Sequence, residues 1–168
     1  MRKGIVSVFL MVAALSFVSV PEASAKDQTW AVRLGALGQV KPGGNGMFTF
    51  GAANEYAFGG PLWFEWGTRF AVDGDAMFIA VQLGLLGKVA FGAWVPTFRL
   101  DFMFDNVIPF EFVSNGYQYS LGGAFGPGLR YDFGGRAVFV DVTFEVARWL
   151  RGTKPLYFAI VPTAGFQF

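Results

Sequence analysis

The sequence has 168 residues, of which 54% are hydrophobic, 18% aromatic and 15% charged, and it contains neither cysteine nor histidine. Its length suits a single domain. The lack of cysteine excludes disulfides, thiolate zinc sites and cysteine nucleophiles. The lack of histidine removes the commonest general base and metal ligand. Thirteen basic and twelve acidic residues give a net charge of +1, which is too balanced for a nucleic-acid-binding surface.

Residues 1–25 have the features of a secretory signal peptide. Two basic residues are followed by an uncharged apolar run over residues 4–20 and by a small-residue A-x-A sequence that ends at Ala25. The run is shorter than the roughly 20 residues of a membrane-spanning helix, so cleavage after Ala25 is favoured over a retained anchor. The predicted mature domain is residues 26–168, and it is formally neutral.

The mature chain alternates large apolar residues with small or polar ones, which is the periodicity of a β-strand. In residues 117–133 the odd positions are mostly aromatic or aliphatic, whereas the even positions are Gly, Ala, Ser, Gln, Arg or Asp. The charge-free stretch over residues 76–87 is too short for a spanning helix. Eight strands are predicted, within residues 29–36, 48–52, 62–73, 77–85, 97–104, 117–133, 138–146 and 156–168.

The predicted turns fix which residues lie opposite each other in each hairpin. Opposite residues share a face of the sheet, so the polar face of one strand must meet the polar face of the next. A turn at Gly134-Gly135 pairs Arg130 with Phe139, and a turn at residues 74–75 pairs two polar faces in the same way. The predicted turns at one end of the sheet are residues 57–61, 87–88 and 134–135. Those at the other end are residues 40–45, 74–75, 105–116 and 151–154.

The fifth strand does not fit this scheme. A two-residue turn at Gly87-Lys88 places Val89 and the apolar residues after it on the same face as Arg99. Either this end of the interior is apolar, or a bulge near Pro96 reverses the register.

Eight antiparallel strands predict an up-and-down barrel, either soluble with its large apolar residues inside or membrane-embedded with those residues outside. The interior of an eight-stranded barrel only just holds its side chains, so the small-residue face fits inside and the Phe-rich face does not. Charges on the small-residue face can neutralise one another there, whereas an Arg facing lipid at mid-depth costs about 2–4 kcal/mol. The predicted polar network in the lumen consists of Arg33, Glu65, Arg69, Arg99, Asp101, Arg130, Asp132, Asp141 and Glu145.

On these features the sequence resembles the OmpA-like and OmpX-like outer-membrane barrels of Gram-negative bacteria. The resemblance rests on the signal peptide, the alternating segments over residues 28–168, and the terminal Phe166-Gln167-Phe168. It implies an all-β, eight-stranded antiparallel transmembrane barrel in the cell outer membrane, monomeric and with both termini in the periplasm. It also implies that Phe166 and Phe168 form the signal for the barrel-assembly machinery, and that outer-membrane lipid and lipopolysaccharide are the surroundings.

Residues near the strand ends predict contacts with the membrane. The five tryptophans are expected to belong mainly to interfacial girdles; they are Trp30, Trp63, Trp66, Trp94 and Trp149. Arg148, Arg151 and Lys154 cluster near the outer end of the last hairpin, where they are expected to meet lipopolysaccharide phosphates.

The sequence favours a non-catalytic function. Outer-membrane barrel enzymes resemble one another in needing a histidine, which this chain lacks. Asp141 and Glu145 share a face and are conceivable as an acid–base pair, but neutralisation of the lumen explains them better. The prediction is a structural, envelope-integrity or surface-interaction role, without a cofactor, metal or nucleic-acid partner. The alternatives are a narrow channel or conduit for small or hydrophobic solutes, and an assembly partner of another envelope protein.

Overall fold

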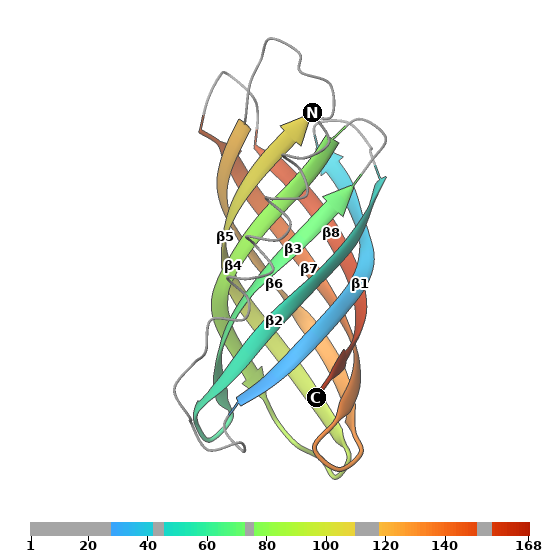
Figure 1. Cartoon of the computed structure of the whole chain (residues 1–168). Helices are drawn as coiled ribbons and strands as arrows, with labels where there is room; N and C mark the ends of the chain where they lie inside the picture. The colour runs from blue at the N-terminus through green and yellow to red at the C-terminus, as the bar shows by residue number, and fades with distance from the viewer. Residues whose placement is uncertain (1–27, 42–45, 73–75, 110–117, 151–155) are drawn as a thin grey trace.

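The computed structural model describes residues 28–41, 46–72, 76–109, 118–150 and 156–168. Eight antiparallel strands pair in chain order, and β1 pairs with β8 to close a barrel (Figure 1). The strands are β1 (Gln28–Lys41), β2 (Gly46–Gly59), β3 (Leu62–Val72), β4 (Ala76–Lys88), β5 (Trp94–Pro109), β6 (Gln118–Asp132), β7 (Ala137–Trp149) and β8 (Tyr157–Gln167). The predicted fold class is therefore confirmed. The predicted signal peptide lies outside the described residues.

The described part of the chain holds no helix that is long and apolar enough to cross a membrane. β1 begins, and the chain ends, at the lower end of the view in Figure 1. The connections β2–β3, β4–β5 and β6–β7 lie at this same end, which we call the periplasmic end after the orientation implied by the resemblance. The opposite end is the outer end.

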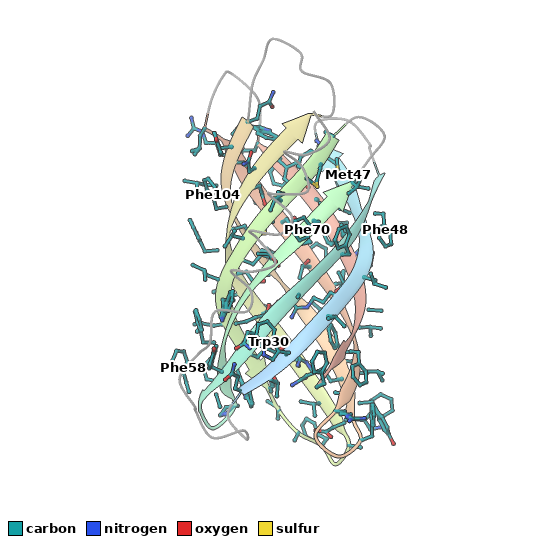
Figure 2. The ribbon with its side chains drawn as sticks, viewed as in Figure 1. Trp30, Met47, Phe48, Phe58, Phe70 and Phe104 are labelled. Atoms are coloured by element: carbon teal, nitrogen blue, oxygen red, sulfur yellow. The ribbon has the colours of Figure 1, made fainter. Side chains whose placement is uncertain are left out.

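The two faces of the barrel wall differ sharply in composition. Along β7 the odd positions are buried and the even positions are exposed, apart from half-buried Trp149 at its end. The exposed positions carry large apolar side chains, and Figure 2 shows Phe48, Phe58 and Phe104 projecting away from the wall. Most buried positions carry small, polar or charged side chains, and Phe139 is the large exception on β7. This sidedness is the one expected when a Phe-rich face cannot fit inside eight strands.

Most of the predicted register is confirmed. Arg130 pairs with Phe139 across the β6–β7 hairpin, and Arg69 pairs with Ala80 across β3 and β4. A Gly134-Gly135 turn joins β6 to β7, and both glycines adopt positive φ. Polar faces therefore meet polar faces, as the sequence pattern requires.

The predicted two-residue turn at Gly87-Lys88 is wrong. Lys88 pairs with Thr97 inside the β4–β5 ladder, and the connection is the five-residue segment 89–93, in which Gly92 adopts φ +63°. Because the turn is longer, Arg99 faces the lumen while Val89 is exposed beyond the end of the strands. Pairing of β5 with both neighbours continues through residues 97–107 without a register shift, so no bulge is needed near Pro96.

The predicted loop over residues 105–116 begins too early. β5 continues to Pro109, and Asp105 pairs with Ala80 on one side and Ser120 on the other. Residues 105–109 pair with β4, and residues 105–107 also pair with β6, so this segment belongs to the barrel wall. The predicted turns at 74–75 and 151–154 lie outside the described residues, as do residues 42–45 of the predicted turn at 40–45.

Gly126 marks a close approach between β6 and β7. A Cβ atom at this position would collide with the backbone carbonyl oxygen of Val142. We expect Gly126→Ala to lower the free energy of unfolding by about 1–3 kcal/mol, because the backbone must shift. The measurement is urea-induced unfolding in lipid vesicles, with Gly38→Ala as the matched control. At Gly38 the nearest atom, the carbonyl oxygen of Ile160, is 3.6 Å away. Equal losses in the two variants would contradict this expectation.

Candidate functional site: the polar lumen

The periplasmic half of the lumen is organised around Glu55 of β2, which is fully buried. Its two carboxylate oxygens accept hydrogen bonds of 2.8 and 2.9 Å from the guanidinium of Arg130 on β6. The Nζ atom of Lys88 lies 2.6 Å from Oε2, and Arg33 lies 3.7 Å from Oε1. In an eight-membered ring of strands, β2 and β6 are four strands apart. The Glu55–Arg130 pair therefore crosses the full width of the lumen.

A second carboxylate, Glu65 of β3, binds two arginines. Arg33 donates to Oε1 at 2.9 Å and also to Oε2. Arg99 donates from Nη2 to both oxygens at 2.7 and 2.6 Å. Arg99 also lies 3.8 Å from Asp101. These contacts link β1, β3 and β5 across the interior and join the Glu65 cluster to Glu55 through Arg33.

A third ion pair lies toward the outer end. Arg69 of β3 donates two hydrogen bonds to the carboxylate of Glu145 on β7, one of them at 2.8 Å. β3 and β7 are also four strands apart, so this pair crosses the lumen as the Glu55–Arg130 pair does. A bidentate guanidinium–carboxylate contact fixes both the distance between the two side chains and their relative orientation.

Arg69 separates two small cavities inside the barrel. One cavity lies on the outer side and includes Asp105, Ser120 and Tyr157 in its lining. The other lies on the inner side and includes Arg33 and Arg99. Arg69 is the only residue that lines both. The Arg69–Glu145 pair therefore stands between them.

Aromatic and apolar side chains fill the remaining lumen. Near the periplasmic end, Lys88 Nζ lies 3.5 Å from the ring centroid of Trp63, and the Phe139 ring lies 5.1 Å from Arg130. Near the outer end, a buried apolar cluster narrows the interior. Its members are Leu37, Met47, Ala71, Ala147, Tyr157, Ala159 and Val161, with Phe78 packed against them.

Most of the predicted lumen residues lie inside the barrel. The side chains of Arg33, Glu65, Arg99, Asp101, Arg130, Asp141 and Glu145 are buried, and that of Arg69 is 11% exposed. Five of these eight belong to the ion pairs with Glu65 or Glu145, and Arg130 pairs with Glu55. Asp101 contacts only the edge of this network, through Arg99. Asp141 is buried without a hydrogen bond to its Oδ2 atom.

Asp132 does not belong to the network, which corrects the prediction. Asp132 follows the alternation that places even-numbered residues of β6 in the lumen. It is, however, the last residue of β6, and its side chain is exposed beyond the lumen. Its Oδ1 atom accepts hydrogen bonds from the backbone N–H groups of Gly134 and Gly135, at 3.0 and 3.2 Å. Turn formation therefore explains this aspartate better than neutralisation does.

The predicted network lacks three charged lumen residues: Glu55, Lys88 and Asp105. Each lies just beyond the predicted end of its strand, and β2, β4 and β5 extend far enough to include them. Glu55 has the same parity as Thr49 and Gly51, and Asp105 the same parity as Arg99 and Asp101. Extending the alternation by a few residues would have found both.

Two tryptophans depart from the expected girdle. Trp63 lies under Lys88 in the lumen, and Trp149 lines the outer cavity. Trp30 and Trp66 face outward, with ring centroids 6.2 Å apart. Arg148 is exposed near the outer end, whereas Arg151 and Lys154 lie outside the described residues. Among the described residues, no group of three or more His, Cys, Asp or Glu could hold a metal ion.

Comparison with solved structures identifies the architecture. Neisserial surface protein A superposes with a TM-score of 0.70 over 87% of this chain and 98% of its own, at 10% identity. The chain has the fold of the eight-stranded outer-membrane β-barrels. The N-terminal barrel domain of OprF from Pseudomonas aeruginosa matches this outer-membrane barrel at TM-score 0.58 and 13% identity, over 83% and 97% of the two chains. No family model and no curated protein matches the sequence.

A third match is the outer membrane protein OprG from Pseudomonas aeruginosa. Its TM-score is 0.55 at 14% identity, over 84% of this chain and 95% of its own. At these identities the likeness extends to the fold of the outer-membrane barrel and not to particular site residues. The role of the lumen has to be inferred from its own contacts.

Proposed function

We propose that this chain is an integral outer-membrane protein with a closed lumen, and that its role is structural or surface-interacting rather than catalytic. The observation that carries the proposal is the pair of ion bridges across the lumen, Glu55–Arg130 and Arg69–Glu145. Each joins strands on opposite sides of the barrel. Breaking a buried pair leaves an uncompensated charge at a cost of several kcal/mol, so the closed arrangement is strongly favoured.

The outer face supports the membrane location. Large apolar side chains cover it over most strands, with exposures of 59% for Leu34, 57% for Phe48 and 56% for Val140. A contiguous apolar band of this extent is unfavourable in water and suits a lipid environment. The predicted signal peptide supplies the route to the periplasm.

The C-terminal strand supports insertion by the barrel-assembly machinery. Phe166 and Phe168 lie on the outward face of the last strand segment with ring centroids 6.1 Å apart. The backbone of Phe168 exchanges two hydrogen bonds of 2.9 Å with Trp30 of β1. These bonds join the first strand to the last and form only when the barrel closes. Before closure the backbone of this segment has no β1 partner, and we assign the segment as the signal for the assembly machinery.

Planar-bilayer recording tests the closed lumen. We expect the wild-type protein to give no stable single-channel steps, because charge pairs and apolar side chains block its interior. We expect the double variant Arg69→Ala with Glu145→Ala to give no steps either, because it joins the two cavities while the Glu55–Arg130 pair still crosses the periplasmic half of the lumen. Arg136→Ala is the matched control, since Arg136 is exposed at the periplasmic turn.

Heat modifiability on electrophoresis checks that each variant is a folded barrel before recording. Stable steps in the wild type, altered in the double variant and unchanged in Arg136→Ala, would overturn the closed-lumen proposal. That result would support the channel or conduit function instead.

A further inference from the structure

The outer cavity lies within the lumen on the outer side of the Arg69–Glu145 pair. Trp149, the last residue of β7, and Tyr157, the first residue of β8, line it, and these two strands are joined at the outer end. All of its lining side chains occupy lumen positions, so a ligand would reach it from water rather than from lipid. The lining consists of Leu37, Arg69, Ala71, Phe78, Ala80, Asp105, Ser120, Trp149 and Tyr157.

Asp105 is the carboxylate of this cavity. Its side chain is only 7% exposed, and its Oδ2 atom accepts a hydrogen bond of 2.8 Å from Ser120 Oγ. Among the described residues it makes no ion pair. Arg69, the guanidinium that lines the same cavity, is held by both oxygens of Glu145. Arg69 is thus the one cation among the described residues that line this cavity, and it already pairs with Glu145 and not with Asp105. Burying a carboxylate costs free energy unless a cation pairs with it.

Three aromatic rings share the cavity with this carboxylate: those of Phe78, Trp149 and Tyr157. The faces of aromatic rings attract cations, most strongly where water is excluded. A carboxylate and aromatic rings around one cavity therefore favour the same kind of ligand.

The size of the free space selects the type of cation. The cavity leaves room for about one water-sized group beside its lining. A primary ammonium group has this size and three hydrogen-bond donors, whereas a quaternary ammonium or a guanidinium is larger. We propose that the outer cavity binds the primary ammonium group of a soluble amine, with Asp105 as its counter-ion and the three aromatic rings as its walls.

This site does not depend on whether the lumen conducts. Asp105 lies on the outer side of the Arg69–Glu145 pair, so an amine can occupy this cavity without crossing from one side of the pair to the other. Loss of amine binding would therefore leave the closed-lumen proposal intact, and channel activity would leave the amine site intact.

Isothermal titration of the protein purified from outer membranes tests the site, with putrescine as the probe. The expected result is saturable binding of putrescine and no binding of 1,4-butanediol, which has the same carbon chain without charge. Asp105→Asn is expected to weaken putrescine binding by about ten- to hundredfold, the loss of one charge-assisted hydrogen bond. Asp132→Asn makes the same chemical change at the other end of the barrel and is expected to leave binding unchanged.

A second variant keeps the test decisive if Asp105→Asn fails to fold. Phe78→Leu retains an apolar side chain but removes one ring, and it is expected to weaken putrescine binding by about three- to thirtyfold. Absence of saturable putrescine binding would overturn the proposal. So would equal binding of the diol, or undiminished binding by a folded Asp105→Asn or Phe78→Leu variant.

Discussion

Replacing Glu55 with glutamine is expected to lower the free energy of unfolding by about 3–5 kcal/mol. Glutamine has nearly the same shape, but it removes the negative charge that faces Arg130 and Lys88 at 2.8 and 2.6 Å. Both cations then remain in a lumen where Glu55 is their only ion-pair partner among the described residues. The measurement is urea-induced unfolding in lipid vesicles, followed by tryptophan fluorescence.

Asp132→Asn is the matched control for this change. Asp132 is exposed, and asparagine keeps the Oδ1 acceptor that binds Gly134 and Gly135. We expect a change within about 0.5 kcal/mol, as for most surface substitutions. If Glu55→Gln were as mild as Asp132→Asn, the ion network would not be what holds the lumen closed.

Placing arginine at Leu100 is expected to cost about 2–4 kcal/mol of unfolding free energy in lipid vesicles. Leu100 lies near the middle of β5, faces outward with 57% exposure, and pairs with Leu85 and Phe125 on the neighbouring strands. A guanidinium at this depth must leave water for hydrocarbon. Urea-induced unfolding of the wild type and the variant in the same vesicles gives the difference.

Leu62→Arg makes the same substitution at the first residue of β3, at the periplasmic end of the outer face. We expect it to cost about 0–1 kcal/mol, since the penalty falls near the membrane interface. The contrast between the two depths is the signature of a lipid-facing wall. Equally small costs at both positions would show that the apolar face is not embedded in hydrocarbon.

The alternation of residues was enough to predict the barrel and its sidedness. In residues 117–133 the period of two is nearly uninterrupted, and an eight-stranded interior has no room for the phenylalanines of that segment. The volume limit therefore decides which face points inward, and the positions of Arg33, Arg69 and Glu145 follow from parity alone.

Strand ends were harder to predict, because parity does not say where pairing stops. Asp132 has lumen parity but ends its strand, so turn hydrogen bonds use its carboxylate. Lys88 looked like a turn residue beside Gly87, yet five further residues separate it from β5 and it pairs with Thr97. These differences depend on backbone pairing, which a short sequence window does not contain.

By itself, the sequence determined that eight alternating strands form a barrel with charges inside and most of its large apolar residues outside, because periodicity and side-chain volume are local properties. Only the tertiary structure decided which charges meet. Glu55 pairs with Arg130 and Arg69 with Glu145 because closure of the ring brings β2 opposite β6 and β3 opposite β7. Closure also leaves Asp105 beside three aromatic rings from separate strands. Which residues meet across the lumen depends on the register offsets between all neighbouring strands, summed around the barrel. Every strand contributes to that sum.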